Sequence, residues 1–286
     1  DTRLAISKKA GTVWSEAPDN ICFEYELGDK KQTDALFSRA HHVATMQVDI
    51  SRVSVAPMET RACIGEYDTF EKRYTLYTGS QGPHGLRQAI AEPILKIPQN
   101  KLRVISEDMG GAFGMRSGPY PENILVLWTA KLLGRPVKWT GDRTESFQSD
   151  DQARDNISTV ELALDESGRF LALRVTTIAN LGAYLTLLGP HSSTNNLGSL
   201  SNTYKTRSIY THVTGVFTNT NSTGPYRGAG RPEAVYCVER VIDTAAQEMG
   251  IDPAELRRLN LIPKITEPFN TGFLFTYDSG EFEKNM

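Results

Sequence analysis

One stretch rich in glycine and proline, GPYRGAGRPEA at residues 224–234, runs directly into the most regular helical pattern of the chain. Over about residues 232–249 apolar side chains recur at spacings of three and four, and Gly250 follows as a stop signal. A helix N-terminus presents unpaired N–H groups and the positive end of the helix dipole, and glycines let a ligand come close. The stretch therefore predicts an anion-binding turn, to which Arg227 and Arg231 add positive charge.

A second glycine-rich turn, DMGGAFGMRSGP at residues 108–119, repeats this arrangement between an expected strand and an expected helix that begins at Pro121. Two such loops indicate one large anionic ligand held from two sides, although glycine and proline also favour ordinary turns. Neither loop fits a nucleotide motif. Met109 stands where a P-loop needs its first glycine, and Glu233 replaces the third glycine of the dinucleotide fingerprint. A nucleotide-dependent enzyme is therefore the least favoured class.

Segments with strand-like alternation and segments with helical spacing interleave along the rest of the chain, around one long hairpin at residues 158–180. The pattern predicts an α+β fold with mixed sheets and helices. The first 40 residues are mostly polar and irregular, so we interpret residues 1–40 as a linker and lead-in segment. Residues 41–286 then form the main domain, with room for two sub-lobes that divide near residue 150. The expected strands are 42–57, 73–80, 101–106, 135–140 and 209–219, and the expected helices are 33–40, 84–95, 121–133, 232–249 and 252–260.

The overall composition is that of an ordinary globular protein, with 39% hydrophobic residues and a formal net charge of −3 in 286 residues. This charge excludes a general nucleic-acid binder. The sequence has no apolar run of membrane-spanning length and no signal-peptide pattern, so we expect a cytoplasmic protein. Three unevenly spaced cysteines favour neither disulfides nor zinc. The chain opens at Asp1 and closes without a helix stop or tail, so we expect a segment of a longer polypeptide.

Three motifs occur in a characteristic order: GSQGPHGLR at 79–87, GGAFGMR at 110–116 and GPYRGAGRPEAVYCVERVIDTAA at 224–246. In this order and context the chain resembles the molybdenum hydroxylases, the xanthine dehydrogenase and aldehyde oxidase family. It is most similar to the bacterial carbon-monoxide-dehydrogenase-like large subunits of the second form, which carry a YRGAGR loop. The resemblance covers nearly the whole chain. It implies the first molybdopterin-binding domain of a large subunit.

The resemblance also implies a molybdenum-pterin cofactor, with the cytosine dinucleotide form expected for a bacterial-type member. Molybdenum is then held through the pterin sulfurs, so the protein supplies no direct metal ligand. By the family pattern, Gln81 corresponds to a glutamine near an oxo ligand of the metal. The remaining implied cofactor-binding residues belong to the two glycine-rich loops. They are Gly110, Gly111, Ala112, Phe113 and Gly114 in the first loop, and Arg227, Gly228 and Ala229 in the second.

Departures from the family pattern bear on the substrate. Gly228 takes the place of the copper-carrying cysteine of carbon monoxide dehydrogenases, which argues against carbon monoxide. Ser117 and Asn195 stand where purine-oxidising members carry a glutamate and an arginine, which argues against a purine. With Tyr226 expected on the substrate side, these residues form the implied substrate pocket. The implied reaction is hydroxylation of an aldehyde or N-heterocycle-type carbon with oxygen from water.

The family's general base is a glutamate in a downstream segment that this sequence does not match, so no catalytic residue is expected in the chain. The implied partners are a second molybdenum-cofactor-binding domain of the same polypeptide, and subunits that carry FAD and iron–sulfur clusters. The isolated chain is then expected to be inactive. The alternative is a non-catalytic cofactor-binding or scaffold domain. We expect the glycines of the second loop to let the backbone approach the cofactor, so that Gly228→Val leaves stability nearly normal but loses metal or activity. A purely structural turn, or a positive φ at Gly228, predicts lower stability instead.

Overall fold

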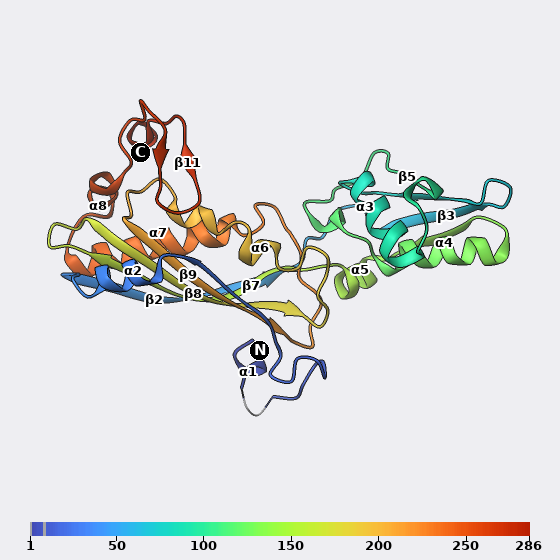
Figure 1. Cartoon of the computed structure of the whole chain (residues 1–286), viewed down its shortest axis with the longest axis horizontal. Helices are drawn as coiled ribbons and strands as arrows, with labels where there is room; N and C mark the ends of the chain where they lie inside the picture. The colour runs from blue at the N-terminus through green and yellow to red at the C-terminus, as the bar shows by residue number, and fades with distance from the viewer. Residues whose placement is uncertain (1, 8–9) are drawn as a thin grey trace.

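The computed structural model describes residues 2–7 and 10–286 and shows two lobes side by side (Figure 1). The larger lobe is built on a five-stranded sheet with the order β1-β9-β8-β7-β2. Strands β8 and β9 run parallel, and the other neighbouring pairs are antiparallel. The bounds of these strands are β1 Ile21–Gly28, β2 His42–Val53, β7 Ala153–Leu164, β8 Phe170–Gly182 and β9 Ser208–Phe217.

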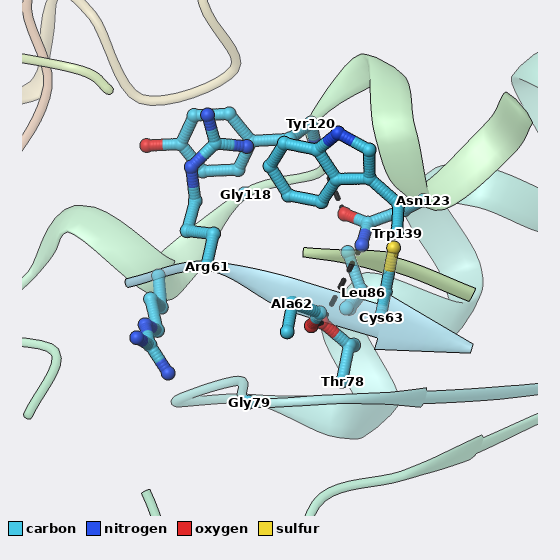
Figure 2. A pocket seen from close by; sticks show the side chains of 11 residues that line it. Arg61, Ala62, Cys63, Thr78, Gly79, Leu86, Gly118, Tyr120, Asn123 and Trp139 are labelled. Carbon is cyan, nitrogen blue, oxygen red and sulfur yellow. Dashed lines mark hydrogen bonds between the residues drawn. The ribbon is translucent and has the colours of Figure 1, made fainter. Parts of the chain in front are cut away.

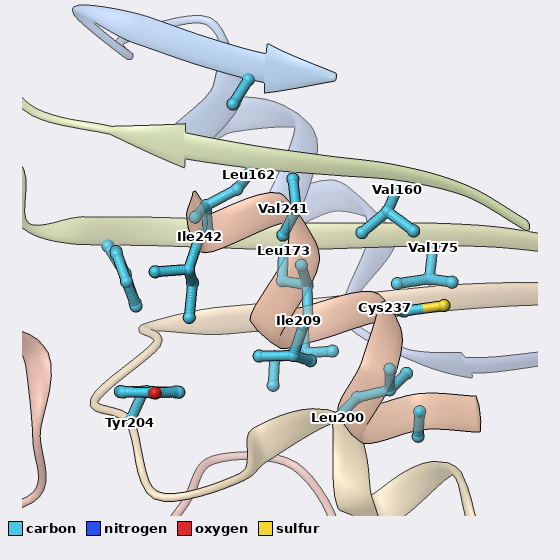
Figure 3. Packing of buried hydrophobic residues seen from close by; sticks show 14 of the residues in the cluster. Val160, Leu162, Leu173, Val175, Leu200, Tyr204, Ile209, Cys237, Val241 and Ile242 are labelled. Carbon is cyan, nitrogen blue, oxygen red and sulfur yellow. The ribbon is translucent and has the colours of Figure 1, made fainter. Parts of the chain in front are cut away.

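The long helix α7, Arg231–Met249, covers one face of this sheet (Figure 3), and the short helix α2, Lys30–Phe37, packs on β8 and β9. The apolar stripe of α7 that the sequence predicts is the buried one: Val241 and Ile242 are fully buried against the strands. Gly250, with a φ of 67°, ends the helix in the left-handed conformation. The main core of the protein therefore lies between α7 and the sheet.

The smaller lobe has a four-stranded sheet with the order β5-β4-β3-β6, on which two helices pack. Its elements are β3 Ala62–Asp68, β4 Arg73–Thr78, α3 Pro83–Ile90, the π-helical segment η1 Ala91–Leu95, β5 Leu102–Ile105, α4 Pro121–Leu133 and β6 Val137–Thr140. Gly65 in β3 lets α4 lie directly on the strand, because a Cβ at this position would come within 2.5 Å of the Val126 backbone.

Short elements complete the described chain. They are α1 Thr2–Ala5, η2 Gln99–Lys101, η3 Met115–Ser117, α5 Arg143–Ser149, α6 His191–Thr194, η4 Leu197–Ser201, α8 Pro253–Asn260, β10 Phe269–Asn270, β11 Thr276–Tyr277 and η5 Phe282–Asn285. Among residues 2–7 and 10–286, none of the helices combines the length and apolar character that a membrane crossing needs.

The predicted α+β class with mixed sheets is confirmed, but two features of the predicted organisation differ from the structure. Residues 21–37 are no lead-in segment, because β1 pairs along β9 and α2 packs on the same sheet. The lobes also do not divide at a single point near residue 150. The chain leaves the large sheet after β2 and returns to it with β7, so the smaller lobe is an insertion between two paired strands. A strand pairing between distant segments is invisible to local patterns.

Candidate functional site

The two glycine-rich loops meet at the junction of the lobes. The backbone N–H of Arg227 donates to the carbonyl of Phe113 over 2.9 Å, and the Arg227 guanidinium lies 4.9 Å from the Phe113 ring centre. At Gly114, with a φ of 111°, a Cβ would come within 2.3 Å of the Pro225 carbonyl oxygen. Gly114 is therefore required for the contact between the loops.

The first loop keeps three consecutive donors without a protein acceptor. Within the described chain, the backbone N–H groups of Gly111, Ala112 and Phe113 donate to no protein atom. Gly111, Phe113 and Gly114 have φ values of 108°, 52° and 111°, and successive amides in such alternating backbones form anion-binding concavities. Gly110 differs, because its N–H donates to Oε2 of Glu59 over 3.0 Å. The predicted cofactor loop therefore offers donors at residues 111–113.

Gln81 reaches this loop from the start of α3. Its Oε1 accepts a hydrogen bond from the Gly114 N–H over 2.7 Å, and the Ser117 hydroxyl lies 3.5 Å from the same oxygen. An N–H can donate only to the amide oxygen, so this bond sets the orientation of the side-chain amide. The Nε2 group of the exposed Gln81 then has no protein acceptor among the described residues. It is available as a donor to a ligand oxygen.

The second loop turns through three consecutive residues with positive φ: Gly228 at 88°, Ala229 at 45° and Gly230 at 98°. A Cβ on Gly228 would lie 2.6 Å from the ring of Pro232, and a Cβ on Gly230 would lie 1.9 Å from the Ser192 carbonyl oxygen. These glycines are required by the backbone conformation and by neighbouring chain atoms. This geometry favours the structural alternative for Gly228, in which Gly228→Val lowers stability.

The helix N-termini contribute less to this site than the sequence suggests. The segment η3 and residues 118–120 separate the first loop from α4, whose entry is capped by Asn123 through its Oδ1 and the Tyr120 N–H at 3.0 Å. At the start of α7, the Arg231 N–H donates to Gly228 within the loop, and Pro232 has no N–H. The N–H groups of Gly228 and Gly230 donate to no protein atom in the described chain, so the candidate ligand donors are amides of both loops together with side chains.

Arg154, which no sequence motif singled out, anchors the second loop. Its guanidinium donates to the buried carboxylate of Glu233 over 2.6 Å and to the carbonyl of Arg227 over 3.0 Å. Arg154 also has a φ of 67°, a strained conformation for a residue with a side chain. The surrounding QARDN sequence carries no local signal of this role. A positive φ inside a strand is visible only in the folded backbone.

The three residues implied for a substrate pocket, Ser117, Tyr226 and Asn195, have different neighbours in the structure. Ser117 lies beside Gln81, as described above. Tyr226 packs against Val55, Met115 and Tyr120, in a small cluster between the lobes. Its side chain contributes to this cluster, and the expectation that it lines the substrate side has no support in these contacts.

The implied pocket residue Asn195 is exposed and pairs with His191, 3.0 Å away. The neighbouring Asn196 reaches the second loop instead, because its side-chain amide donates to the carbonyl of Ala229. The loop contact of Asn196 was not expected from the sequence, and the pocket role implied for Asn195 stays a prediction.

Comparison with known proteins identifies relatives over nearly all of the chain. Residues 13–261 match the family model described as the molybdopterin cofactor-binding domain. The carbon monoxide dehydrogenase large chain of Hydrogenophaga pseudoflava is 36% identical over 278 residues, which are 96% of this chain and 34% of that protein.

Two solved structures are similar to the fold. The carbon monoxide dehydrogenase from Oligotropha carboxidovorans superimposes with a TM-score of 0.92 at 32% identity, over 99% of this chain and 37% of that one. The quinoline 2-oxidoreductase from Pseudomonas putida 86 has a TM-score of 0.84 at 30% identity, over 93% and 34%. The chain thus spans about a third of the length of these relatives.

Proposed function

Because this chain belongs to the molybdopterin cofactor-binding domain family, we propose that its two facing loops bind the molybdenum-pterin cofactor of an oxidoreductase large subunit. The observation that carries the proposal is the row of three backbone N–H groups at Gly111, Ala112 and Phe113, with no protein acceptor in the described chain, beside the Gln81 amide. Arg227 adds positive charge from the second loop.

The chemistry of these groups fits such a ligand. A pterin and its phosphates present oxygen acceptors, and the loops present N–H donors and a guanidinium. In the described part of the chain, no cluster of three or more His, Cys, Asp or Glu side chains could hold a metal ion directly. The N–H donors and the guanidinium of the two loops suit a metal that is held by its own organic ligand. When bound, the cofactor supplies the redox-active metal, while Gln81 and the first loop orient it by hydrogen bonds.

The proposed reaction class is hydroxylation of an aldehyde or N-heterocycle-type carbon with oxygen from water. Similarity to a quinoline 2-oxidoreductase supports a heterocyclic substrate class. Carbon monoxide is disfavoured because the backbone at Gly228 has a φ of 88° and Pro232 occupies the space of a side chain. A cysteine, which the copper-containing members carry at this point, does not fit the conformation.

The rest of the catalytic machinery is proposed to lie outside these 286 residues. It comprises a second cofactor-binding domain with the general base, and partner subunits with FAD and iron–sulfur clusters. The coverage of only about a third of the relatives supports this division. We therefore expect the isolated chain to hold no stoichiometric molybdenum and to be inactive. The rival proposal, a scaffold domain without chemistry, predicts no molybdenum in the longer protein either.

The test is metal and nucleotide analysis of the longer polypeptide, purified with its partner subunits. We expect about one molybdenum per chain and release of cytidine monophosphate on acid hydrolysis. A folded, complete preparation without molybdenum would overturn the proposal. In the loaded enzyme, Gln81→Ala should lower turnover about ten- to a hundredfold, because a hydrogen bond to a charged group contributes roughly 1.5–3 kcal/mol. Unchanged turnover with normal metal content would show that Gln81 only supports the loop.

A further inference from the structure

Tyr120 occupies a central place behind the two loops. Its ring is buried, with 8% of the residue exposed, and packs with Val55, Met115 and Tyr226. The guanidinium of Arg61 stacks on the ring at 3.8 Å from its centre, as Figure 2 shows. The adjoining cavity in this view has a volume of about 20 Å³, enough for a single water, so no substrate enters here.

The hydroxyl of Tyr120 makes two hydrogen bonds that point to different parts of the chain. It donates to the carbonyl of Met115 over 3.0 Å and accepts from the N–H of Asp151 over 3.1 Å. Burial raises the pKa of Tyr120 far above its usual value, so the hydroxyl keeps its proton and remains a donor at neutral pH. Both bonds are therefore present together.

Each bond ends at a segment that continues into one of the loops. Met115 closes the first loop, since its N–H donates to the carbonyl of Ala112 over 3.0 Å. Beyond Asp151, the N–H of Gln152 donates to Ser222 over 2.9 Å, and its carbonyl accepts from Gly224 over 2.8 Å. The entry to the second loop is thus tied to the segment that Tyr120 holds.

We propose that Tyr120 is a positioning residue for the ligand site, whose hydroxyl braces the 110–117 loop against the 224–230 loop. The inference rests on the proposed function for the identity of the ligand, but the brace itself is a property of this chain. The direct contact between the loops is the 2.9 Å hydrogen bond from the Arg227 N–H to the carbonyl of Phe113, whose own N–H is one of the three amide donors. The stability of this hydrogen bond therefore shows whether the Tyr120 hydroxyl holds the two loops together.

The experiment is residue-resolved hydrogen exchange on the 286-residue chain, with Tyr120→Phe compared with the unaltered protein. This change keeps the ring and its contact with Arg61 but removes both hydrogen bonds. We expect the amides of Arg227 and Gly114 to exchange at least about tenfold faster, which corresponds to about 1.4 kcal/mol of local opening. Amides in the large sheet, such as Leu173 in β8, should keep their rates.

Tyr74→Phe is the matched control. Tyr74 is also 8% exposed, but its hydroxyl makes no hydrogen bond within the described chain, so this change should leave Arg227 and Gly114 unaffected. Equal exchange at Arg227 in Tyr120→Phe and the unaltered chain would overturn the proposal. A uniform increase that includes Leu173 would also overturn it, because it indicates general destabilisation. Absence of molybdenum from the longer protein would refute the proposed ligand and leave the exchange result intact.

Discussion

A half-buried carboxyl at the junction of the lobes, Asp151, is expected to make the stability of this protein depend on pH. Asp151 has no hydrogen-bond partner for its carboxylate in the described chain, and Oδ2 lies 3.2 Å from where a Cβ on Gly224 would be. Burial raises the pKa of Asp151 from 3.8 to about 7, while Arg61 opposes the shift and Asp150 adds to it. Arg61 is already paired with Asp150 at 2.6 Å.

The direction of the pH dependence follows from the difference in proton binding between the folded and the unfolded chain. Between about pH 4 and pH 7 the folded protein keeps a proton on Asp151 that the unfolded chain has lost, so stability falls as pH rises through this window. Above pH 7 the loss levels off at about 4 kcal/mol. Asp151→Asn keeps the shape and removes the titration.

The assay is urea denaturation of Asp151→Asn and the unaltered chain at pH 5, 6, 7 and 8 at constant ionic strength. We expect the variant's advantage in unfolding free energy to grow by about 2.5 kcal/mol from pH 5 to pH 8. Other titrating groups cancel in this difference. The exposed Asp108, changed to Asn, is the control and should show a constant difference. An Asp151→Asn difference that stays constant across the series would refute the reasoning.

Three further outcomes follow from the same geometry. Gly228→Val should lower the melting temperature of the chain, because strain at positive φ alone costs roughly 1–2 kcal/mol and the Pro232 ring lies 2.6 Å from the new Cβ. The control Gly82→Ala adds a Cβ with nothing within 4 Å and should leave the melting temperature unchanged. Equal melting temperatures for the two variants would contradict the strain at Gly228. Arg154→Ala should cost about 3–5 kcal/mol in urea denaturation because it leaves the buried Glu233 unpaired, and a cost below about 1 kcal/mol would show that the carboxylate finds another partner. Burial raises the pKa of Cys63 to about 11, so its thiol should resist maleimide labelling at pH 8 until the chain unfolds. Labelling is followed at Cys63 itself because Cys22 is only half-buried, and rapid modification of Cys63 in the native protein would contradict its burial.

The elements with long, regular patterns could be predicted from the sequence. Helix α7 follows from its apolar spacing and its Gly250 stop, and the hairpin of β7 and β8 follows from alternation on both sides of a turn. Four strands escaped prediction: β1, β3 and the two-residue strands β10 and β11. β1 does alternate apolar and polar side chains, but it lies in the first 40 residues, which were interpreted as a lead-in segment. β3 contains Gly65, which weakens a strand pattern and is explained only by the approach of α4.

Some residues of the candidate site could likewise be predicted from the sequence, and others could not. Gln81 and the two glycine-rich loops were found from the sequence, because glycine and proline mark local backbone conformation and the motifs occur in a recognisable order. Arg154, Asn196 and Tyr120 were not found, because each takes its role from a hydrogen bond with a residue at least 31 positions away in the chain.

The sequence by itself determined where the chain turns and which helices follow the turns, since these depend on local φ preferences and on periodicity. Only the tertiary structure decided that the glycines of the second loop accommodate the protein's own atoms, and that Arg227 meets Phe113. It also decided that Asp151 lies half-buried at the lobe junction. These properties arise when the chain packs together in three dimensions, because close packing leaves space for one arrangement of backbone and side chains and withdraws groups from water.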